Sequence, residues 1–541
     1  MTIGIDRRQL VQLGTFGLGA LAAPSILNAS FASGFTHAVA SGEPSQHSVL
    51  LWTRFASAAE TKLTAEVSRD MDFTQIIGGG NVAASPARDH IAKLTVTGLP
   101  ANSWYYYRFI APDGQMSPVG RTRTLPDGGD APFRLGVFSC ANMPFGYFNA
   151  YGHAAQHGQI DLAVHLGDYF YEYRRGTYPS SRAVLANRII EPANEIIALA
   201  DYRLRYASYR LDPDLQRLHQ LYPMIAMWDD HEFANDAWQG GAQNHDEAEG
   251  DWADRRFAAE KAYREWMPVR DLDASGSRWS RYEIGNLATI HMTESRITGR
   301  SKQLSLGAAL RGAEDRMQAL RKFRDGAWQD PTRSMLGSKQ ESWLAKGFAA
   351  SKAKWNIWAQ QTIIGKVQQP AESVDWLDPE SPPFVKGRVR LGAMVAKAGL
   401  PSNMDMWSGY PAARARALSA AQSADADLVV LTGDSHNAWA FDLDHDGKPA
   451  GVEMAGQSVS SPGFEYYLRG AKPADIAKSM MAANSELKWT DTSQRGYMTV
   501  TLSQEKVTSH WHFMATTGKR DLALAGSHRM TVKRGKRAFE R

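Results

Sequence analysis

Residues 165–173 read His165-Leu-Gly-Asp168-Tyr-Phe-Tyr171-Glu-Tyr173. An apolar run from Asp161 to Leu166 leads into this stretch and predicts a buried strand that ends at a Gly-Asp turn. Beyond the turn, the chain presents a carboxylate and phenols within a few residues. Acidic and phenolic oxygens at one strand end suit a highly charged metal ion. We therefore expect Asp168 to be the bridging ligand of a site that holds more than one ion.

Other apolar runs of the chain also end in residues of metal-binding type. Run 133–138 leads to Ser139-Cys140-Ala-Asn142, and run 222–228 leads to Asp229-Asp230-His231-Glu232. Run 287–292 leads to Thr293-Glu294-Ser295-Arg296, and run 427–431 leads to Thr432-Gly433-Asp434-Ser435-His436. One Gly-Asp strand end is more often a plain turn or a helix cap. Several such ends in one region instead favour a shared site, because α/β enzymes gather functional groups at the carboxyl ends of buried strands. We predict a layered α/β sandwich with the site on one open rim.

The region before this sandwich has a different pattern. The segments 35–41, 48–55, 63–69, 90–99 and 104–112 are predicted short strands, separated by Gly, Pro, Asp and Asn turns. Such strands are typical of a fibronectin-III or immunoglobulin-like β-sandwich. A chain of 541 residues is long enough for two domains. We therefore expect a small all-β domain at 34–126, a linker around 124–130, and a catalytic domain at 131–515. Within the latter, residues 192–220 are predicted to be helical, and Ser338 and Glu341 are predicted to form a capping box.

The first 32 residues have the pattern of a signal peptide. Arg7 and Arg8 precede a weakly apolar run that ends at Pro24, and Ser30-Phe-Ala32 offers a small-x-small cleavage pattern. The run is too short for a transmembrane segment. The adjacent arginines resemble a twin-arginine signal, although a chance pair is the alternative. We expect the twin-arginine export machinery to be a partner and the protein to be periplasmic or secreted.

The charge of the chain argues against a nucleic-acid-binding role. The net charge of +4 is small for this length, whereas nucleic-acid binders carry a concentrated basic face. The exception is the basic segment 516–541, which we interpret as a solvated tail.

The ligand types indicate which ions the site would hold. A phenol has a pKa near ~10, so ligation by Tyr171 as phenolate favours a trivalent ion. Cys140, the only cysteine, would suit a transition metal as thiolate. Together they indicate ferric iron, Fe(3+), although a packed aromatic ring and a buried thiol are equally good explanations of each residue alone.

The remaining candidates supply hard oxygen, imidazole and acid groups. Asp434, Asp168 and either Asp229 or Asp230 offer carboxylates, Asn235 an amide oxygen and His436 an imidazole. Carboxylate and amide oxygens suit a second ion such as calcium, Ca(2+). Such ions acidify a bound water and clamp the phosphoryl group of an ester.

Three further residues are catalytic candidates. His231 or Asp230 is the candidate acid for the leaving group, although a structural histidine is as good an explanation of His231. Arg296 is the candidate phosphate contact, and a structural ion pair is its alternative.

Several of these segments, in this order, resemble the PhoD-like alkaline phosphatases and phosphodiesterases. The segments are Phe35-Thr-His-Ala-Val-Ala-Ser-Gly42, Leu50-Leu-Trp-Thr-Arg54, Phe138-Ser-Cys-Ala-Asn142, Gly167-Asp-Tyr-Phe-Tyr-Glu172, Tyr202-Arg with Tyr206 and Tyr209-Arg, Trp228-Asp-Asp-His-Glu232, Leu336-Gly-x-x-Gln340 with Trp343-Leu, and Gly433-Asp-Ser-His436. The resemblance covers most of the chain beyond the signal segment.

The resemblance implies a calcineurin-like metallophosphoesterase fold and a secreted phosphatase or phosphodiesterase that uses a metal-activated hydroxide. It implies ferric iron held by Cys140, Asp168, Tyr171 and Asp434. It also implies calcium nearby, with Asp168 bridging and with Asn235 and His436 as contributors. Twin-arginine export is common in the family.

The chain departs from the family pattern at two places. Trp407-Ser408-Gly409-Tyr410 has serine where the family has an acidic residue, and Glu294-Ser295-Arg296 stands where the family has Asp-Thr-Arg. A lost carboxylate would alter metal occupancy or substrate choice. The alternative functions are a phospholipase D-like phosphodiesterase and a non-catalytic surface binding protein.

Overall fold

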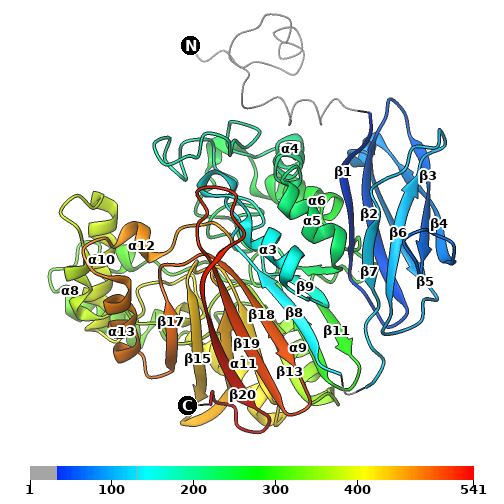
Figure 1. The fold of residues 1–541 in the computed structure, drawn as a ribbon. Helices are drawn as coiled ribbons and strands as arrows, with labels where there is room; N and C mark the ends of the chain where they lie inside the picture. The colour runs from blue at the N-terminus through cyan, green and yellow to red at the C-terminus, as the bar shows by residue number, and fades with distance from the viewer. Residues whose placement is uncertain (1–32, 130, 541) are drawn as a thin grey trace, which may run out of the picture.

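The structure is a computed structural model that describes residues 33–129 and 131–540. Within these ranges the strands form sheets of nine, seven and four strands (Figure 1). The fold has the expected mixed α/β sheets and an all-β region at its N-terminal end. The predicted signal peptide, 1–32, lies outside the described residues. No helix in the described part is both long and apolar enough to cross a membrane.

The N-terminal region packs two groups of strands face to face. On one side, β1 (Gly34–Gly42), β2 (Ser48–Ala56) and β5 (Ile91–Thr97) pair antiparallel. On the other side lies the four-stranded sheet β4 (Ile76–Ala84), β3 (Thr61–Ser68), β6 (Trp104–Ile110) and β7 (Gly120–Arg123). Alternate residues such as Val49, Leu51, Val67 and Tyr107 fill the core between them. This alternation is the cause of the face-to-face packing.

Strand β4 was not predicted, because its three consecutive glycines suggest a turn. Gly78 and Gly80 instead face the other group of strands, where a Cβ would lie 3.1 Å from the Val96 side chain and 3.3 Å from that of Leu94. Their small size therefore allows the two sheets to approach closely.

The N-terminal strands are continuous with the sheet of the α/β region. Beyond β1, the nine-stranded sheet continues through β10 (Met224–Ala226), β9 (Leu162–His165), β8 (Phe133–Phe138), β18 (Gly496–Leu502), β19 (Lys506–Met514) and β20 (Leu524–Lys533). At the junction, Gly42 pairs with Met224 and the Glu43 N–H donates to the Met224 carbonyl at 3.0 Å. Strands β8, β9 and β10 are parallel, so their carboxyl ends lie at one edge.

The seven-stranded sheet forms the second layer. Its order is β11 (Ser280–Ile284), β12 (Ala288–Met292), β13 (Trp355–Ala359), β14 (Leu428–Thr432), β16 (Lys448–Ala455), β15 (Ala438–His445) and β17 (Leu487–Asp491). On β14, Val429 belongs to the core shared with the nine-stranded sheet, whereas Val430 belongs to the core shared with helices. Both faces are covered, which explains the continuous apolar runs of the sequence.

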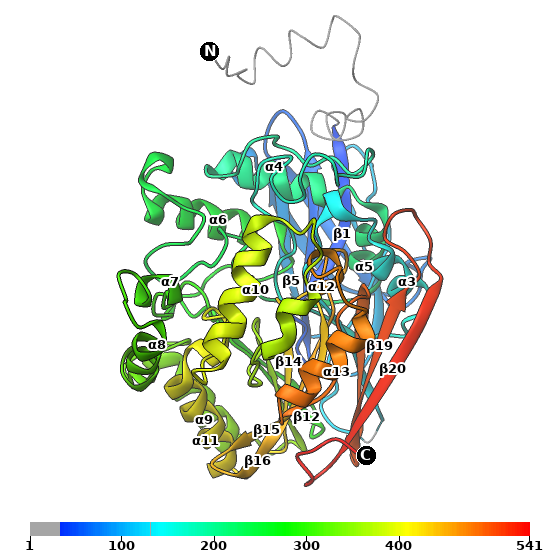
Figure 2. The ribbon, with the colours of Figure 1, turned by 90° about the vertical axis from the view of Figure 1, so that its left-hand side faces the viewer.

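Helices cover the outer faces of both sheets. Helices α9 (Ser338–Ala350) and α11 (Pro411–Ser423) lie beside the seven-stranded sheet, away from β19 and β20 (Figure 2). The other sheet is covered by α3 (Asn149–His157), α4 (Leu199–Arg210), α5 (Pro213–Leu221) and α6 (Trp252–Trp266). The predicted helical segment 192–220 is thus two helices, because Asp212 caps α5 and Pro213 begins it.

The predicted capping box was wrong. Gly337 is the N-cap of α9 and Ser338 is already helical. The Glu341 carboxylate accepts a hydrogen bond from Ser334 at 2.6 Å and pairs with Arg416 at 2.8 Å.

The expectation of a solvated tail at 516–541 was also wrong. Residues 524–533 form β20, which pairs antiparallel with β19 along its length. Its His528 ring stacks on Trp489 at 4.0 Å, and Val532 is buried. Several basic residues of the segment lie outside β20 and pair with acidic side chains: Arg520 with Asp214 at 3.6 Å, and Arg537 with Asp427 at 3.9 Å.

The junction between β1 and β10 leads to a first prediction. In Gly42→Ala, the new Cβ would clash with the Pro268 carbonyl oxygen and lie 2.8 Å from that of Met224. We expect the free energy of unfolding to fall by about 1–3 kcal/mol, measured by urea denaturation. Gly526→Ala, on β20, is the control because its Cβ would meet no atom within 4 Å. Equal stability of the two variants would contradict the tight junction.

Candidate metal centre

The candidate residues converge where strands of both sheets end. Cys140 follows β8, Asp168 follows β9 and the segment 229–232 follows β10, all in the nine-stranded sheet. Arg296 follows β12 and Asp434 follows β14 of the other sheet. The two layers therefore bring their polar strand ends to one rim, as the sequence predicts.

The loops at this rim hold a rare backbone conformation. Cys140, Asp168, Asp434 and His436 have φ angles of 59°, 53°, 59° and 63°. Residues other than glycine seldom adopt this left-handed backbone conformation. Those that do are concentrated at functional sites. Hydrogen bonds fix the first two loops to each other, because the Cys140 N–H donates to the Gly167 carbonyl at 3.2 Å and the Ala141 N–H to that of Asp168 at 2.8 Å.

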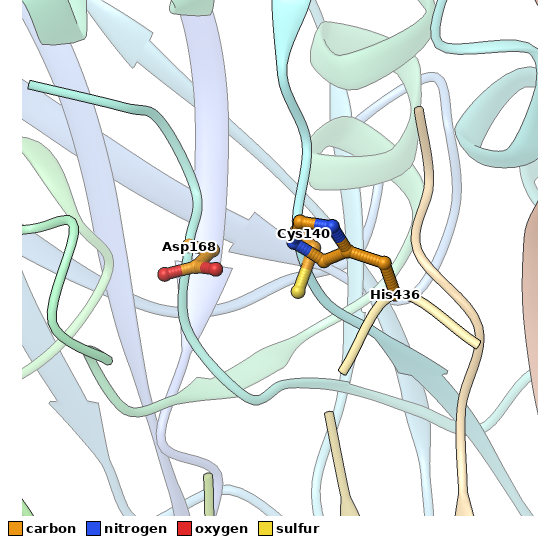
Figure 3. A group of neighbouring side chains, drawn as sticks. All are labelled: Cys140, Asp168 and His436. Atoms are coloured by element: carbon orange, nitrogen blue, oxygen red, sulfur yellow. The ribbon is translucent and has the colours of Figure 1, made fainter. Parts of the chain in front are cut away.

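A thiol, a carboxylate and an imidazole form the first group of possible ligands. One ligand atom each of Cys140, Asp168 and His436 lies within 4.8 Å of the others (Figure 3). The His436 Nδ1–H donates to the Pro462 carbonyl at 2.9 Å, so in the neutral ring Nε2 carries the lone pair. Burial lowers the pKa of His436 to about 3. The imidazole is therefore neutral and suited to bind a metal.

Tyr171 lies against this group. Its hydroxyl donates to Asp168 Oδ2 at 3.1 Å and lies 3.0 Å from His436 Nε2. Ser461, which the sequence reasoning missed, donates to the same hydroxyl at 2.7 Å. Burial and the Asp168 charge raise the pKa of both Tyr171 and Cys140. A cation among these residues would oppose that effect and favour phenolate and thiolate.

Carboxylates dominate two adjoining groups. Asp168, Asp230 and His231 form one, and Asp229, Asp230 and Asp434 the other, each with ligand atoms within 4.8 Å of one another. Asp168 Oδ1 and Asp229 Oδ2 are buried and have no hydrogen-bond partner among the described residues, whereas Asp230 Oδ1 has the Arg296 guanidinium at 3.3 Å. Unpaired buried carboxylate oxygens are costly without a cation. These residues fit bound metal ions, with Asp168 shared between groups.

Arg296 neutralises part of this negative charge. The buried guanidinium bonds to Asp229, contacts Asp405 at 2.7 Å, and lies 3.3 Å from both Asp230 and Asp434. The structure therefore places Arg296 in a buried ion-pair network.

Asp405 is a carboxylate that the sequence reasoning missed. Burial alone would raise its pKa, but the Arg296 and Arg300 guanidiniums hold the pKa at about 2. Ser408, in the position where the family has an acid, has its hydroxyl 3.4 Å from the Gly365 carbonyl. A negative charge is thus present nearby, three residues earlier in the chain. The surrounding segment, Pro401-Ser-Asn-Met-Asp-Met-Trp407, has no strand-end pattern that would have singled out Asp405.

His231 has the partners expected of a proton donor. Its Nδ1 lies 2.7 Å from Glu172 Oε2, and its ring packs on Tyr171 at 4.2 Å between centroids. Burial would lower the pKa of His231, but the charges of Glu172, Asp230 and Asp168 raise it well above its usual value. The side chain therefore carries a proton at neutral pH.

Asn235 shares the same glutamate. Its backbone N–H donates to Glu172 Oε1 at 2.8 Å, and its side-chain amide donates to Gln243 at 2.9 Å. In this structure these bonds direct the Asn235 amide nitrogen to Gln243, and the residue is linked to His231 through Glu172.

Glu232 links two of the strand ends. Its carboxylate accepts from the backbone N–H groups of Asp168, Tyr169 and Asp229, at 3.0, 2.6 and 2.7 Å. Glu232 thus holds the rim loops together and is not a candidate metal ligand. The sequence alone did not distinguish this role from those of Asp229, Asp230 and His231.

Comparison with known proteins gives consistent matches. The family described as PhoD-like phosphatase matches residues 135–511, and its N-terminal domain matches residues 21–126. Alkaline phosphatase D of Bacillus subtilis (strain 168) is 31% identical, over 94% of this chain and 84% of the relative. A solved structure titled "Structure of PhoD" has a TM-score of 0.77 and 29% identity, over 94% of this chain and 92% of that chain. These matches confirm the resemblance drawn from the motifs.

The carboxylates around Arg296 lead to a second prediction. In Arg296→Met, four carboxylates lose their shared cation, and we expect the metal-free protein to lose about 3–5 kcal/mol of stability. Bound metal ions should offset part of this loss. In thermal unfolding, the difference in Tm between the variant and wild type should therefore be larger with a metal chelator present than without it. Arg278→Met is the control, because Arg278 pairs with Glu260 at 2.9 Å and with none of these four carboxylates. A loss no larger than that of the control would contradict the assigned role.

Proposed function

The chain belongs to the PhoD-like phosphatase family and is a phosphoric ester hydrolase, and we propose that it acts as a secreted alkaline phosphatase or phosphodiesterase with a ferric iron and calcium centre. The observation that carries this proposal is the convergence of three ligand groups on buried carboxylate oxygens that lack donors. Ions bound there would acidify a water and polarise the phosphoryl oxygens of the substrate.

The two kinds of ligand support two kinds of ion. We assign ferric iron to Cys140, Asp168, Tyr171 and Asp434, because thiolate and phenolate ligands favour a polarising transition metal. We assign calcium to the carboxylate oxygens beside them, with His436 and Asn235 as further contributors.

Protein groups complete the reaction. We propose His231 as the acid that protonates the leaving alcohol, since Glu172 orients the ring and holds its proton. Asp230, whose Oδ2 accepts from the Asp236 N–H at 2.6 Å, is the alternative. Arg296 holds the carboxylates in place, and a phosphate oxygen would reach it only through displacement of one of these partners.

The finer features of the fold are also proposals. We propose that the α/β region, expected at 131–515 and extended by β20 to Lys533, has the layering of calcineurin-like metallophosphoesterases and that the region 34–126 is a fibronectin-III or immunoglobulin-like sandwich. The two stacked sheets with outer helices, and the two facing strand groups, support these assignments. The segment 1–32 would direct export by the twin-arginine machinery to the periplasm or beyond.

Metal content and activity provide the test of the centre. Asp168→Asn should lower kcat/KM for a chromogenic phosphate ester by more than about 100-fold, the upper range for ligand-supporting residues, and should lower the iron and calcium content found by elemental analysis. Cys140→Ser should lower the iron content more than the calcium content. Asp161→Asn, at the opposite end of the same strand, is the control. Full activity and metal content in Asp168→Asn would refute the site.

Export has a separate test. Replacement of both Arg7 and Arg8 by lysine should leave the protein in the cytoplasm, because twin-arginine signals require the arginine pair. Cell fractionation and immunoblotting would measure this. Arg69→Lys is the matched conservative control. Normal export of the double variant would rule out this route.

A further inference from the structure

A cavity of about 470 Å³ is lined by Tyr178, whose ring neighbours that of Tyr171 in the candidate metal centre. Its walls carry five aromatic side chains, together with two carboxylates and a guanidinium. The aromatic residues are Phe145, Tyr178, Phe384, Tyr466 and Tyr467. So many rings around one cavity provide flat apolar surfaces of the kind that bind planar ligands.

The loops that carry the metal ligands also build this cavity. Phe145 follows the Cys140 loop, and Tyr178 follows Tyr171 in the loop after β9. Tyr466 lies in the segment that begins with Ser461 and Pro462, which contact Tyr171 and His436. Three loops therefore contribute both to the wall of the cavity and to the centre.

Ring contacts give the cavity a fixed shape. The Tyr178 ring lies 5.7 Å from that of Tyr171, so one wall is a single ring away from the centre. Phe145 packs edge to face against both Tyr178, at 4.9 Å, and Tyr466, at 5.6 Å. These contacts hold the rings before any ligand arrives, which reduces the entropic cost of binding.

The exposure of the Phe384 side chain is not explained by packing within the fold. The residue lies in the first turn of α10 (Pro383–Ala396), on the wall of the cavity, and its side chain is 68% exposed. An exposed phenylalanine is common by itself. Here it faces the same cavity as four other rings, which suggests a surface that a ligand covers.

Charge limits the kind of ligand. Asp378 and Glu380 line the cavity, whereas Arg469 is the single cationic side chain of the wall and lies over the Tyr466 ring at 5.3 Å. Two carboxylates against one guanidinium disfavour a further anionic group. The cavity therefore suits an uncharged ring.

We propose that this cavity binds the leaving group of the phosphate ester and selects an uncharged planar aromatic ring, from a phenol or from a nucleoside. This inference rests on the proposed function, because the phosphate must sit at the metal centre. The ring would stack on Phe384 and Tyr466 while the ester oxygen faces the centre.

The test compares substrates that differ only in the leaving group. Phe384→Ala should lower kcat/KM about tenfold for 4-nitrophenyl phosphate and for adenosine monophosphate, as expected from the loss of one ring contact. It should leave kcat/KM for glycerol phosphate unchanged. Phe257→Ala is the matched control, because Phe257 is also 68% exposed but lies on α6. A loss for one aromatic substrate alone would identify its ring as the preferred one and support the cavity.

A direct binding measurement distinguishes failure of the cavity proposal from failure of the proposed hydrolase function. Isothermal titration of the holoenzyme with adenosine and with phenol, which stays uncharged below its pKa near ~10, should show weaker binding in Phe384→Ala than in Phe257→Ala. If the protein binds these rings but does not hydrolyse phosphate esters, the proposed function is refuted and the cavity's role in ring binding stands. Hydrolysis with equal losses for aromatic and glycerol esters would refute the cavity and keep the function.

Discussion

Concentrated negative charge is the constraint that shapes the rim of this protein. Carboxylate oxygens of Asp229, Asp230 and Asp434 lie within 4.8 Å of one another, and Asp168 lies equally close to Asp230, in a buried place where carboxylates repel strongly. Arg296 relieves only part of this repulsion, because two carboxylate oxygens still lack a donor. The surrounding structure must hold the groups together against it. The left-handed loop residues and the three backbone bonds to Glu232 have that effect.

The two-sheet architecture provides the rigid frame for these loops. Parallel strands β8, β9 and β10 end at one edge of the nine-stranded sheet, and β12 and β14 end at the facing edge of the other. Because the shared core between the sheets is continuous, a small shift of one sheet would separate Asp434 from Asp168. Packing far from the rim thus fixes its geometry.

The sequence predicted those features that depend on local pattern. The apolar runs that end in Gly-Asp correctly predicted β9 and β14. The alternating segments before residue 126 correctly predicted most strands of the N-terminal region. Features that depend on tertiary contacts were missed. Strand β4 is formed because its glycines fit against the facing strands, and β20 is formed because β19 offers an edge. Asp405 and Ser461 reach the rim from segments whose local sequence does not distinguish them from ordinary loop residues. The four carboxylate partners of Arg296 likewise come from three separate loops.

The position of β18 has a consequence for the order of events during synthesis. Strand β8, which precedes Cys140, has β9 on one side and β18 on the other. Residues 496–502 follow β8 by about 360 residues, and pairing between such distant segments is slow. The edge of β8 therefore stays open while the intervening residues are made. An ion that binds beside Cys140 before this pairing meets a strand that has a neighbour on one side alone.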